Sequence, residues 1–344
     1  MKEDVLAVVL AGGRGERLWP LARAHRPKAL VRIGDKTLLQ ATLERLGTLG
    51  FSPERTLVVG GAGSAAALRE RAPQAHLVLE PDAGDTARAI ALAALVALRL
   101  SDNPVLAVVP SDHVVHDPAP IAAAIRTAVD VARADHLLVA FGTPPLSPST
   151  SYGWLRPEGD NAGGGSRLAE YVEKPDAERA RAMCDSGRYL WNCGTFVFLA
   201  RALIEAFERF QPAILAAARE IDAGRAPLAA PRLSIDHAIL EPATRAGLCA
   251  VEPVRYDRLD VGRLEGLAPL LAPDAADNAL GGDVLALDSE RCVLHSSDAT
   301  IAALGVSDLI VFAQRDVVLV CRRGHVDLGR LLAELAARSR EDLL

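Results

Sequence analysis

Glycines and basic residues follow the first apolar run of the chain at a spacing that suits the binding of a polyphosphate. The run from Val5 to Ala11 is too short for anything but a buried strand, and it leads directly into Gly12-Gly13-Arg14-Gly15. Glycine has no Cβ, so the backbone N–H groups of this segment can approach an anion closely, and Arg17 and Lys28 add positive charge. The sequence therefore predicts a phosphate-binding loop after the first strand.

Two commoner phosphate loops do not fit this segment. A dinucleotide-binding loop needs a third glycine, and counting from Gly13 and Gly15 that position is Leu18. A Walker A loop ends in Gly-Lys-Ser or Gly-Lys-Thr, a triplet that the sequence lacks. A tight turn without a ligand is the alternative for any Gly-Gly-x-Gly segment, but the positions of Arg17 and Lys28 favour a phosphate loop.

Two separated aspartates could provide a metal site for the same ligand. Asp112 follows the apolar run from Val105 to Val109 and a proline, and Asp260 lies in Leu259-Asp260-Val261-Gly262. Magnesium takes hard oxygen ligands, typically one or two carboxylates together with substrate phosphates. Either aspartate alone is better explained as a cap or turn residue, but their combination with the phosphate loop predicts a Mg2+ site.

The stretch from Leu10 to Lys28 resembles the signature of the sugar-1-phosphate nucleotidylyltransferases. Within it, Arg17-Leu18-Trp19-Pro20-Leu21 is similar to the branch of that family that transfers GMP from GTP to mannose 1-phosphate. The resemblance implies an enzyme with these two substrates. It also implies a set of catalytic residues, Arg17, Lys28, Asp112, Lys174 and Asp260, of which Asp112 and Asp260 would hold Mg2+.

The same resemblance implies two groups of binding residues. Those for the nucleotide are Leu10, Ala11, Gly12, Gly13, Arg14, Gly15, Glu80, Pro81, Gly84, Asp85, Thr86 and Ser111. Those for the sugar phosphate are Gly142, Tyr152, Gly153, Glu173, Lys174, Asn192 and Gly194. Lys174 offers a point charge to a phosphate and Glu173 can accept from sugar hydroxyls, although an ordinary surface ion pair would have the same sequence. Asp236 also lies in a segment that matches the family, and its role is left open.

Glu80 is the candidate reader of the base. Guanine presents two neighbouring N–H donors, on N1 and N2, and one carboxylate can accept from both, whereas adenine offers no such pair. A solvated carboxylate at a strand end is the alternative. Two nearby positions depart from the family pattern and affect base selection, since Asp85 replaces a frequent asparagine and Arg88 stands where a small residue or proline is more usual. Thr195 and Leu264 depart in segments that affect the fit of the sugar.

The expected reaction is nucleotidyl transfer. A phosphate oxygen of the sugar 1-phosphate attacks the α-phosphorus of GTP, and pyrophosphate leaves. Three alternatives stay open: uridylyl or thymidylyl transfer to glucose 1-phosphate, guanylyl transfer to a heptose 1-phosphate, and a non-catalytic sensor of nucleotide sugars. A sensor would tolerate losses among the five implied catalytic residues, so their joint presence argues against it.

The elements that must position these residues alternate along the first part of the chain. Strand-like apolar runs and helical patterns follow one another, which predicts an α/β fold with a Rossmann-like, mostly parallel sheet and helices on both faces. In such a sheet, ligands bind beyond the carboxyl ends of the strands. The helical patterns are expected at residues 37–49, 86–100 and 119–134, and the strands at residues 56–59, 76–80, 105–109, 137–141 and 189–199.

From residue 282 onward, short β-type runs recur about every ten residues before a last amphipathic helix near residues 328–337. The resemblance implies the family's β-helical tail, which packs on a partner subunit in many relatives. We therefore predict a catalytic domain at residues 1–275 and a small β-helix-like domain at residues 276–344 that forms a homodimer. A domain that only caps and stabilises the fold is the alternative.

Composition limits the other partners. The chain has 344 residues, of which half are hydrophobic, and 38 basic against 44 acidic side chains, a net charge of −6. This charge argues against nucleic acid and anionic membranes as partners. The longest apolar stretch, residues 89–98, is about half a membrane span. Five cysteines with no Cys-x-x-Cys pair argue against structural zinc or a disulfide framework and favour the cytoplasm.

Overall fold

The computed structural model describes residues 4–24, 26–82, 84–115, 117–159, 164–324 and 327–344. Within them the chain forms two compact units. The first comprises Met1–Ala11, Leu43–Ser111 and Val115–Asp257, and the second comprises Gly12–Thr42, Asp112–Val114 and Arg258–Leu344. The glycine-rich loop and Asp112 therefore belong to the same unit as the C-terminal segment. The domain assignment to residues 1–275 and 276–344 stays a prediction.

A nine-stranded sheet in the order β5-β4-β1-β6-β11-β8-β12-β10-β9 forms the centre of the first unit. Strands β5, β4, β1 and β6 run parallel to one another, and β11 is antiparallel to both β6 and β8. The strands are β1 (Val5–Leu10), β4 (Thr56–Gly61), β5 (His76–Glu80), β6 (Val105–Pro110), β8 (Leu138–Thr143), β9 (Trp154–Pro157), β10 (Ser166–Val172), β11 (Leu190–Leu199) and β12 (Cys249–Pro253). The predicted α/β fold with a mostly parallel sheet is confirmed.

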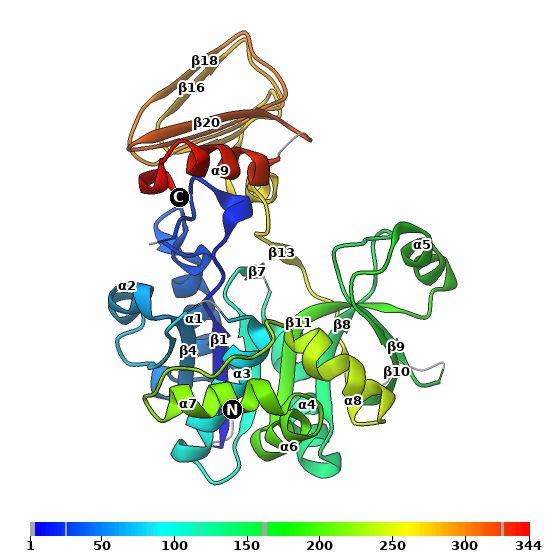
Figure 1. Ribbon diagram of the computed structural model, residues 1–344. Helices are drawn as coiled ribbons and strands as arrows, with labels where there is room; N and C mark the ends of the chain where they lie inside the picture. The colour runs from blue at the N-terminus through cyan, green and yellow to red at the C-terminus, as the bar shows by residue number, and fades with distance from the viewer. Residues whose placement is uncertain (1–3, 25, 83, 116, 160–163, 325–326) are drawn as a thin grey trace. The chain divides into compact units, whose positions relative to one another are not determined.

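Helices cover both faces of this sheet. Every residue of β1 except Leu10 is buried, which requires packing on both sides of the strand. Helices α3, α6 and α7 pack together over one face (Figure 1), and α4 packs against β6, β8, β11 and β12. The helices with residues in this unit are α1 (Leu38–Thr48), α2 (Ala65–Arg71), α3 (Thr86–Leu100), α4 (Ala119–Asp135), α5 (Ala177–Ser186), α6 (Ala200–Phe210), α7 (Pro212–Asp222) and α8 (Glu241–Arg245).

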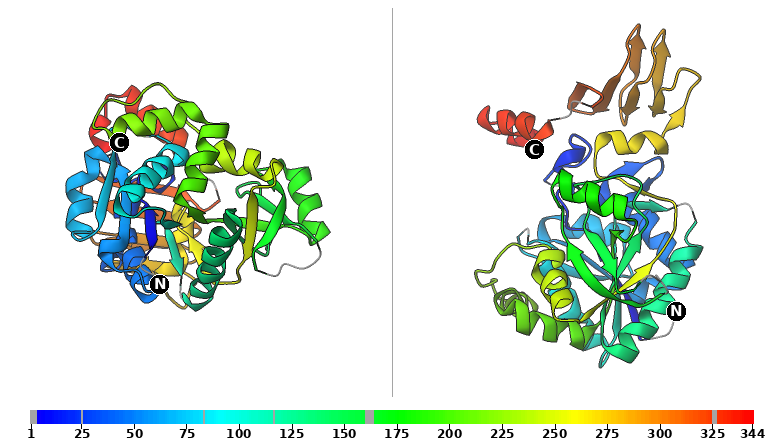
Figure 2. Two further views of the ribbon diagram at one scale, coloured as in Figure 1. Left: turned by 90° about the horizontal axis from the view of Figure 1, so that it is seen from below. Right: turned by 90° about the vertical axis from the view of Figure 1, so that its right-hand side faces the viewer.

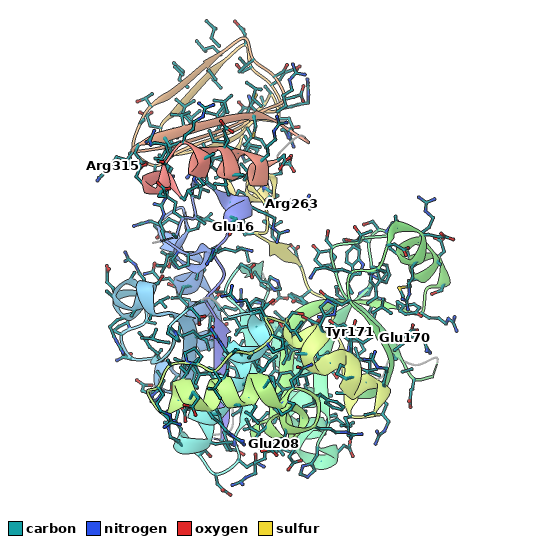
Figure 3. All side chains as sticks on the ribbon, viewed as in Figure 1. Glu16, Glu170, Tyr171, Glu208, Arg263 and Arg315 are labelled. Carbon is teal, nitrogen blue, oxygen red and sulfur yellow. The ribbon has the colours of Figure 1, made fainter. Side chains whose placement is uncertain are left out.

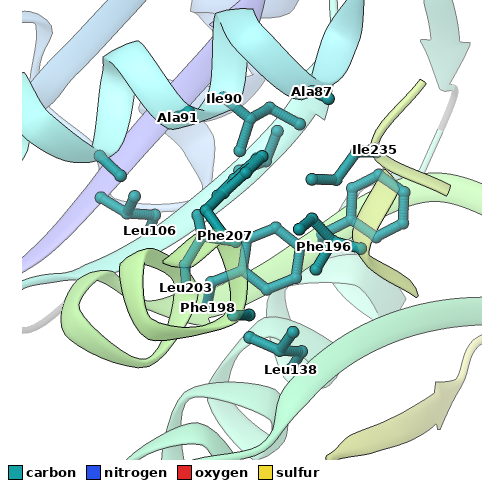
Figure 4. Packing of buried hydrophobic residues seen from close by; sticks show 14 of the residues in the cluster. Ala87, Ile90, Ala91, Leu106, Leu138, Phe196, Phe198, Leu203, Phe207 and Ile235 are labelled. Carbon is teal, nitrogen blue, oxygen red and sulfur yellow. The ribbon is translucent and has the colours of Figure 1, made fainter. Parts of the chain in front are cut away.

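The core between α3, α6 and the sheet combines aliphatic side chains with alanines and aromatic rings (Figure 4). Ile90 of α3 and Phe207 of α6 are completely buried. Phe196 and Phe198 of β11 stack with their ring centroids 5.6 Å apart. Asp85 caps α3, because its carboxylate accepts a hydrogen bond of 2.7 Å from the Thr86 backbone N–H. Helix α3 thus begins immediately after the segment predicted to hold the nucleoside.

The second unit is built largely from short strands. Strands β15 (Ala279–Gly281), β17 (Val293–Ser296) and β19 (Leu309–Gln314) pair in parallel, as do β16 (Val284–Leu287) and β18 (Ile301–Leu304), and β20 (Val317–Arg322) closes one edge (Figure 2). The remaining elements are β2 (Arg32–Ile33), β3 (Lys36–Thr37), β7 (His113–Val115), β13 (Arg258–Asp260), β14 (Ala272–Pro273) and α9 (Leu328–Ala337). The predicted small C-terminal β structure and its last helix are confirmed.

The segment after the glycine-rich loop packs into the core of the second unit. Leu18 and Trp19 are buried in one cluster with Val293 and Phe312. The Trp19 indole N–H donates to the Leu343 carbonyl at 2.7 Å. No helix within the described ranges is both long enough and apolar enough to cross a membrane. All five cysteines are free thiols.

Candidate active site

The glycine-rich loop leaves its backbone open to a ligand. Gly12, Gly13 and Arg14 are exposed, and within the part of the chain that is described, no backbone N–H between Gly12 and Gly15 has a hydrogen-bond partner. The N–H of Ala11, in contrast, donates to Val59 O at 2.7 Å as part of the sheet. The amides available to a phosphate therefore begin at Gly12.

Gly15 allows Lys28 to approach the loop. Its φ of +71° lies in the left-handed region, and a Cβ here would lie 2.8 Å from Ala22 Cβ and 2.9 Å from Lys28 Cβ. Lys28 N–H also donates to Gly13 O at 3.1 Å. The local sequence thus fixes the lysine beside the glycines.

Lys28 forms an ion pair with Asp112. The Lys28 Nζ atom contacts Oδ2 of Asp112, and both side chains are largely buried. Burial alone would raise the pKa of the Asp112 carboxyl, but the charge of Lys28, with a smaller contribution from His113, holds that pKa below its ordinary value. Asp112 is therefore a carboxylate at neutral pH. Two residues that were predicted to act together, 84 positions apart in the sequence, are in contact.

The strand that carries Asp260 lies beside Asp112. Strands β13 and β7 pair, and Val261 N–H donates to Asp112 O at 3.1 Å. The side chain of Asp260 lies outside the described part of the structure, so its role as a Mg2+ ligand stays a prediction. Magnesium held by one or two carboxylates completes its shell with water and phosphate oxygens. Among the described residues there is no cluster of three or more His, Cys, Asp or Glu side chains that could hold a metal without such help.

Arg17 belongs to the second unit but lines a cavity that Lys28 and Asp112 do not line. It is exposed and lines a cavity of about 350 Å³ together with Glu16, Arg263, Glu265 and the start of α9. Glu16 and Arg263 are labelled in Figure 3. Lys28 and Asp112 are not among the lining residues. Arg17 has no ion-pair partner within the described ranges, so its guanidinium is available to an anion.

The implied sugar-phosphate residues meet in a buried network in the first unit. Asn192 Nδ2 donates to the Tyr171 hydroxyl at 2.7 Å and to Asp236 Oδ1 at 2.9 Å. Tyr171 donates to Asp236 Oδ1 at 2.6 Å, and its oxygen lies 3.3 Å from Glu173 Oε2. Lys174 Nζ donates to Glu173 Oε1 at 2.6 Å, but the lysine side chain is mostly exposed. The contact with Tyr171 thus orients the Glu173 carboxylate, while the Lys174 ammonium stays accessible to a phosphate.

Glycines shape the walls around this network. A Cβ at Gly153 would lie 2.6 Å from both Glu173 Oε2 and the Tyr171 hydroxyl. Gly142 lies opposite Asn192 on the neighbouring strand, and Gly194, with a φ of +65°, donates its N–H to Asn192 Oδ1 at 2.9 Å. The structure therefore brings Asn192 together with five of the other six implied sugar-phosphate residues. The seventh, Tyr152, packs its ring 5.0 Å from that of Trp191.

Tyr171 and Asp236 are the residues that sequence reasoning missed or left open. Burial, with the charge of Glu173, raises the pKa of Asp236 to about 6, and burial raises the pKa of the Tyr171 hydroxyl well above its ordinary value. Tyr171 and Glu173 are two positions apart on an extended segment, a spacing that places both side chains on one face and could have identified the tyrosine. Asp236 begins a π-helical turn, Asp236–Leu240, which the sequence does not reveal.

The implied nucleoside segment lies at the end of β5. Glu80 is buried, and its Oε1 accepts from Arg88 Nε at 2.8 Å. Thr86 Oγ1 accepts from the Ile235 N–H at 2.9 Å. A cavity of about 250 Å³ is lined by Asp82, Gly84, Asp85, Arg88 and residues 227–232. Pro81 is exposed, and Ser111 Oγ donates to Leu10 O at 2.8 Å, tying the ends of β6 and β1 together.

Comparisons with known proteins match both parts of this description. Residues 6–233 match a family model described as nucleotidyl transferase, and residues 282–326 match one described as a MannoseP isomerase/GMP-like beta-helix domain. The second match covers strands β16 to β20.

Individual proteins are similar over nearly the whole chain. The mannose-1-phosphate guanylyltransferase of Escherichia coli is 34% identical over 340 residues, covering 93% of this chain and 71% of the relative. That of Klebsiella pneumoniae is 35% identical over 341 residues, with the same coverage of 93% and 71%. A crystal structure from Thermus thermophilus, described as a mannose-1-phosphate geranyltransferase, is 36% identical with a TM-score of 0.84, covering 98% of this chain and 99% of that one.

Proposed function

The chain belongs to the nucleotidyl transferase family, among relatives named mannose-1-phosphate guanylyltransferase, and we propose that it transfers GMP from GTP to α-D-mannose 1-phosphate, giving GDP-mannose and pyrophosphate. The observation that carries the proposal is the ion pair of Lys28 with Asp112 at the base of an open glycine loop. A lysine, a carboxylate and several backbone N–H groups that no described residue pairs with are the parts that phosphoryl chemistry needs.

Charge neutralisation and positioning account for most of the catalysis. The attacking phosphate oxygen of mannose 1-phosphate is already ionised, so no residue has to remove a proton from it. The loop amides from Gly12 to Gly15 and Lys28 would bind the triphosphate, and Arg14 would stabilise the departing pyrophosphate. Arg17 is proposed for the same role, although the cavity that it lines does not include Lys28. These groups make their strongest interactions as negative charge develops on the leaving oxygens, which lowers the barrier.

Asp112 and Asp260 are the proposed ligands of Mg2+. The lowered pKa of Asp112 keeps its carboxylate ionised, and the pairing of β13 with β7 brings the backbone of the Asp260 segment alongside. When bound, Mg2+ would neutralise the phosphate oxygens and hold them in a fixed orientation. Lys28, which contacts Asp112, would add positive charge beside the phosphate oxygens.

The buried network around Asn192 is the proposed site for the sugar. Glu173, held on one side by Tyr171, can accept from mannose hydroxyls, and the exposed Lys174 ammonium can contact the phosphate. The nucleoside would bind at the end of β5, where Glu80 accepts from N1 and N2 of guanine.

We also propose a homodimer in the cytoplasm. Leu285 and Leu287 of β16 and Leu304 of β18 point to the same side of a two-stranded parallel sheet, and each is more than half exposed. An apolar stripe of this kind on a β-helical tail suits contact with a second copy of the chain. The cytoplasm is reducing and would keep the five free cysteines as thiols.

The test is pyrophosphate release by the purified chain with each of the four nucleoside triphosphates against mannose, glucose and heptose 1-phosphates. We expect the highest kcat/KM with GTP and mannose 1-phosphate in the presence of Mg2+. Preference for UTP or dTTP with glucose 1-phosphate would contradict the assigned substrates. Nucleotide binding without turnover on any pair would identify a sensor instead.

A further inference from the structure

Arg88 forms a buried ion pair with Glu80 that the proposed reaction does not use. The guanidinium Nε donates to Glu80 Oε1 at 2.8 Å, and Nη2 contacts both the side chain and the backbone carbonyl of Asp82. Only 11% of the Arg88 side chain and 7% of the Glu80 side chain are exposed. Arg88 therefore links a strand-end carboxylate to the loop that follows it.

The backbone around this pair is shaped to admit it. A Cβ on Gly84 would lie 2.5 Å from Arg88 Nε and 2.6 Å from Glu80 Oε1. The φ of Gly84 does not lie in the left-handed region, so its backbone conformation does not require a glycine. The missing side chain instead leaves space for the ion pair. Arg88 and Gly84 both line the cavity of about 250 Å³ at the end of β5.

Burial and the nearby acidic side chains oppose the ionisation of Glu80, whereas Arg88 favours it. Burial is the largest influence and raises the pKa of the Glu80 carboxyl, and the charges of Asp82 and Asp85 raise it further. Arg88 lowers that pKa by its hydrogen bond and by its charge. Arg232 lies 3.8 Å from Asp82 and is mostly exposed, so it faces Asp82 rather than Glu80. Arg88 is thus the cation that offsets burial at this carboxylate.

We propose that Arg88 is a positioning residue for base selection, which holds Glu80 as an oriented carboxylate so that this side chain can accept both N–H donors of guanine. The inference rests on the proposed function, in which Glu80 contacts the base. A carboxylate can accept about four hydrogen bonds, and Arg88 takes one at Oε1. For Glu80 Oε2 no partner is present among the described residues.

Ionisation is essential to this form of recognition. A protonated carboxyl has an O–H that would face one of the two guanine donors, so it loses an acceptor where guanine needs two. The acceptor pair also disfavours adenine, which places the N1 lone pair against it. Without Arg88, protonation of the buried Glu80 would extend to higher pH, and GTP binding would weaken as the pH falls.

The experiment compares the KM for GTP of the full chain and of Arg88→Met between about pH 6 and about pH 9, at saturating mannose 1-phosphate. We expect the KM of Arg88→Met to exceed that of the wild type about tenfold at the acid end and to approach it at the alkaline end. The KM for mannose 1-phosphate, measured in parallel, should be unchanged. A merely structural role for Arg88 would instead alter both KM values at every pH.

Three further variants separate charge from geometry. Arg88→Lys keeps the charge but not the planar fork, and we expect a modestly raised KM for GTP without the pH dependence. Gly84→Ala keeps both charges but forces them apart. It should therefore raise the KM for GTP at low pH as Arg88→Met does, and it serves as the test if Arg88→Met folds poorly. Arg219→Met removes an exposed arginine that pairs with Glu208 at 2.7 Å, and it should behave as wild type.

Glu80→Gln distinguishes failure of this inference from failure of the proposed function. We expect it to raise the KM for GTP about tenfold at all pH values. If Glu80→Gln has this effect while Arg88→Met and Gly84→Ala match the wild type, the role of Arg88 is overturned and the base reader stands. If all of these variants match the wild type, Glu80 does not read the base, although guanylyl transfer itself is unaffected. If the wild type has no activity with GTP, the proposed function fails first.

Discussion

Two aspartates in different regions of the molecule have opposite electrostatic surroundings. Asp112, near the glycine loop, contacts a lysine and has a lowered pKa, whereas Asp236, in the network around Asn192, faces Glu173 and has a pKa raised to about 6. Both residues are partly buried. The difference follows the ligands that we assign to the two regions. A triphosphate and its cation need fixed charges, whereas a sugar needs donors and acceptors held in a fixed hydrogen-bond pattern.

The backbone differs in the same way. The N–H groups from Gly12 to Gly15 have no hydrogen-bond partner among the described residues, as an anion site requires. Around Asn192 the polar groups are already paired with one another, through Tyr171 and Asp236. The loop is therefore a site that a charged ligand completes, and the network is a preorganised surface on which the sugar ring fits.

The largest effect is expected from removing the charge at the loop. Asp112→Ala should lower kcat by about 10²- to 10³-fold, because Mg2+ would lose a ligand and would neutralise less of the charge that develops on the phosphates. The KM for mannose 1-phosphate should change little. Initial rates of pyrophosphate release measure this change. Asp102→Ala, which removes an exposed aspartate that pairs with Arg201, is the matched control. If Asp112→Ala turned over at the wild-type rate, Asp112 would not be a metal ligand, and its contrast with Asp236 would have no functional meaning.

A substitution in the loop backbone should be next in size. Gly15→Ala places a Cβ in a left-handed backbone and against Lys28 Cβ, so we expect a loss of about 1–3 kcal/mol in the free energy of unfolding together with reduced activity. Chemical denaturation measures the stability. Gly34→Ala has a similar φ of +63° but open space around its Cβ, so it isolates the steric part. Equal losses in the two variants would show that Lys28 does not press on Gly15.

The contribution of the network around Asn192 to stability should depend on pH, through the carboxyl of Asp236. A carboxyl whose folded pKa is raised binds its proton more tightly in the folded state, so it stabilises the fold at low pH and loses that contribution as the pH rises from about 4 to about 6. Asp236→Asn does not titrate, so the melting temperature of wild type relative to this variant should rise as the pH falls from 7 to 5. Glu252, with a pKa raised to about 7, is common to both proteins and cancels in the comparison. A difference that is constant with pH would show that Asp236 is ionised in the fold.

The smallest effect on chemistry is expected far from both regions. Leu304→Asp introduces charge into the exposed stripe of β16 and β18, and it should shift a dimer to a monomer with less than about a twofold change in kcat. Light scattering at several concentrations measures the mass. Leu146→Asp changes another exposed leucine, in the first unit, and should leave the mass unchanged. If the wild type is already a monomer, the stripe is not a dimer interface.

Local patterns made much of the fold predictable. The short apolar run before Gly12 predicts β1, and Asp85 before an alanine-rich stretch predicts the start of α3, because both signals lie within a few residues of the element they define. The recurring short strands after residue 282 were visible for the same reason. Lys28 and Asp112 were both assigned to one triphosphate site from the sequence, but their ion pair was not predicted.

Contacts between distant segments were not predictable. Arg23 donates to Asp316 at 2.7 Å, 293 positions along the chain, and Trp19 reaches Leu343, so the segment after the phosphate loop is part of the second unit's core. Tyr171 and Asp236 are 65 positions apart, and only folding shows that they share a hydrogen-bond network with Asn192. Arg88 was visible as an unusual residue, but its pairing with Glu80 depends on the space left by Gly84.

The most direct test of the central claim is detection of the product itself. Phosphorus NMR of the purified chain with GTP, mannose 1-phosphate and Mg2+ should show the two coupled resonances of a diphosphate diester together with free pyrophosphate, and Lys28→Met should show neither at a comparable rate. Release of inorganic phosphate without a nucleotide sugar, or an equal rate in Lys28→Met, would contradict the account.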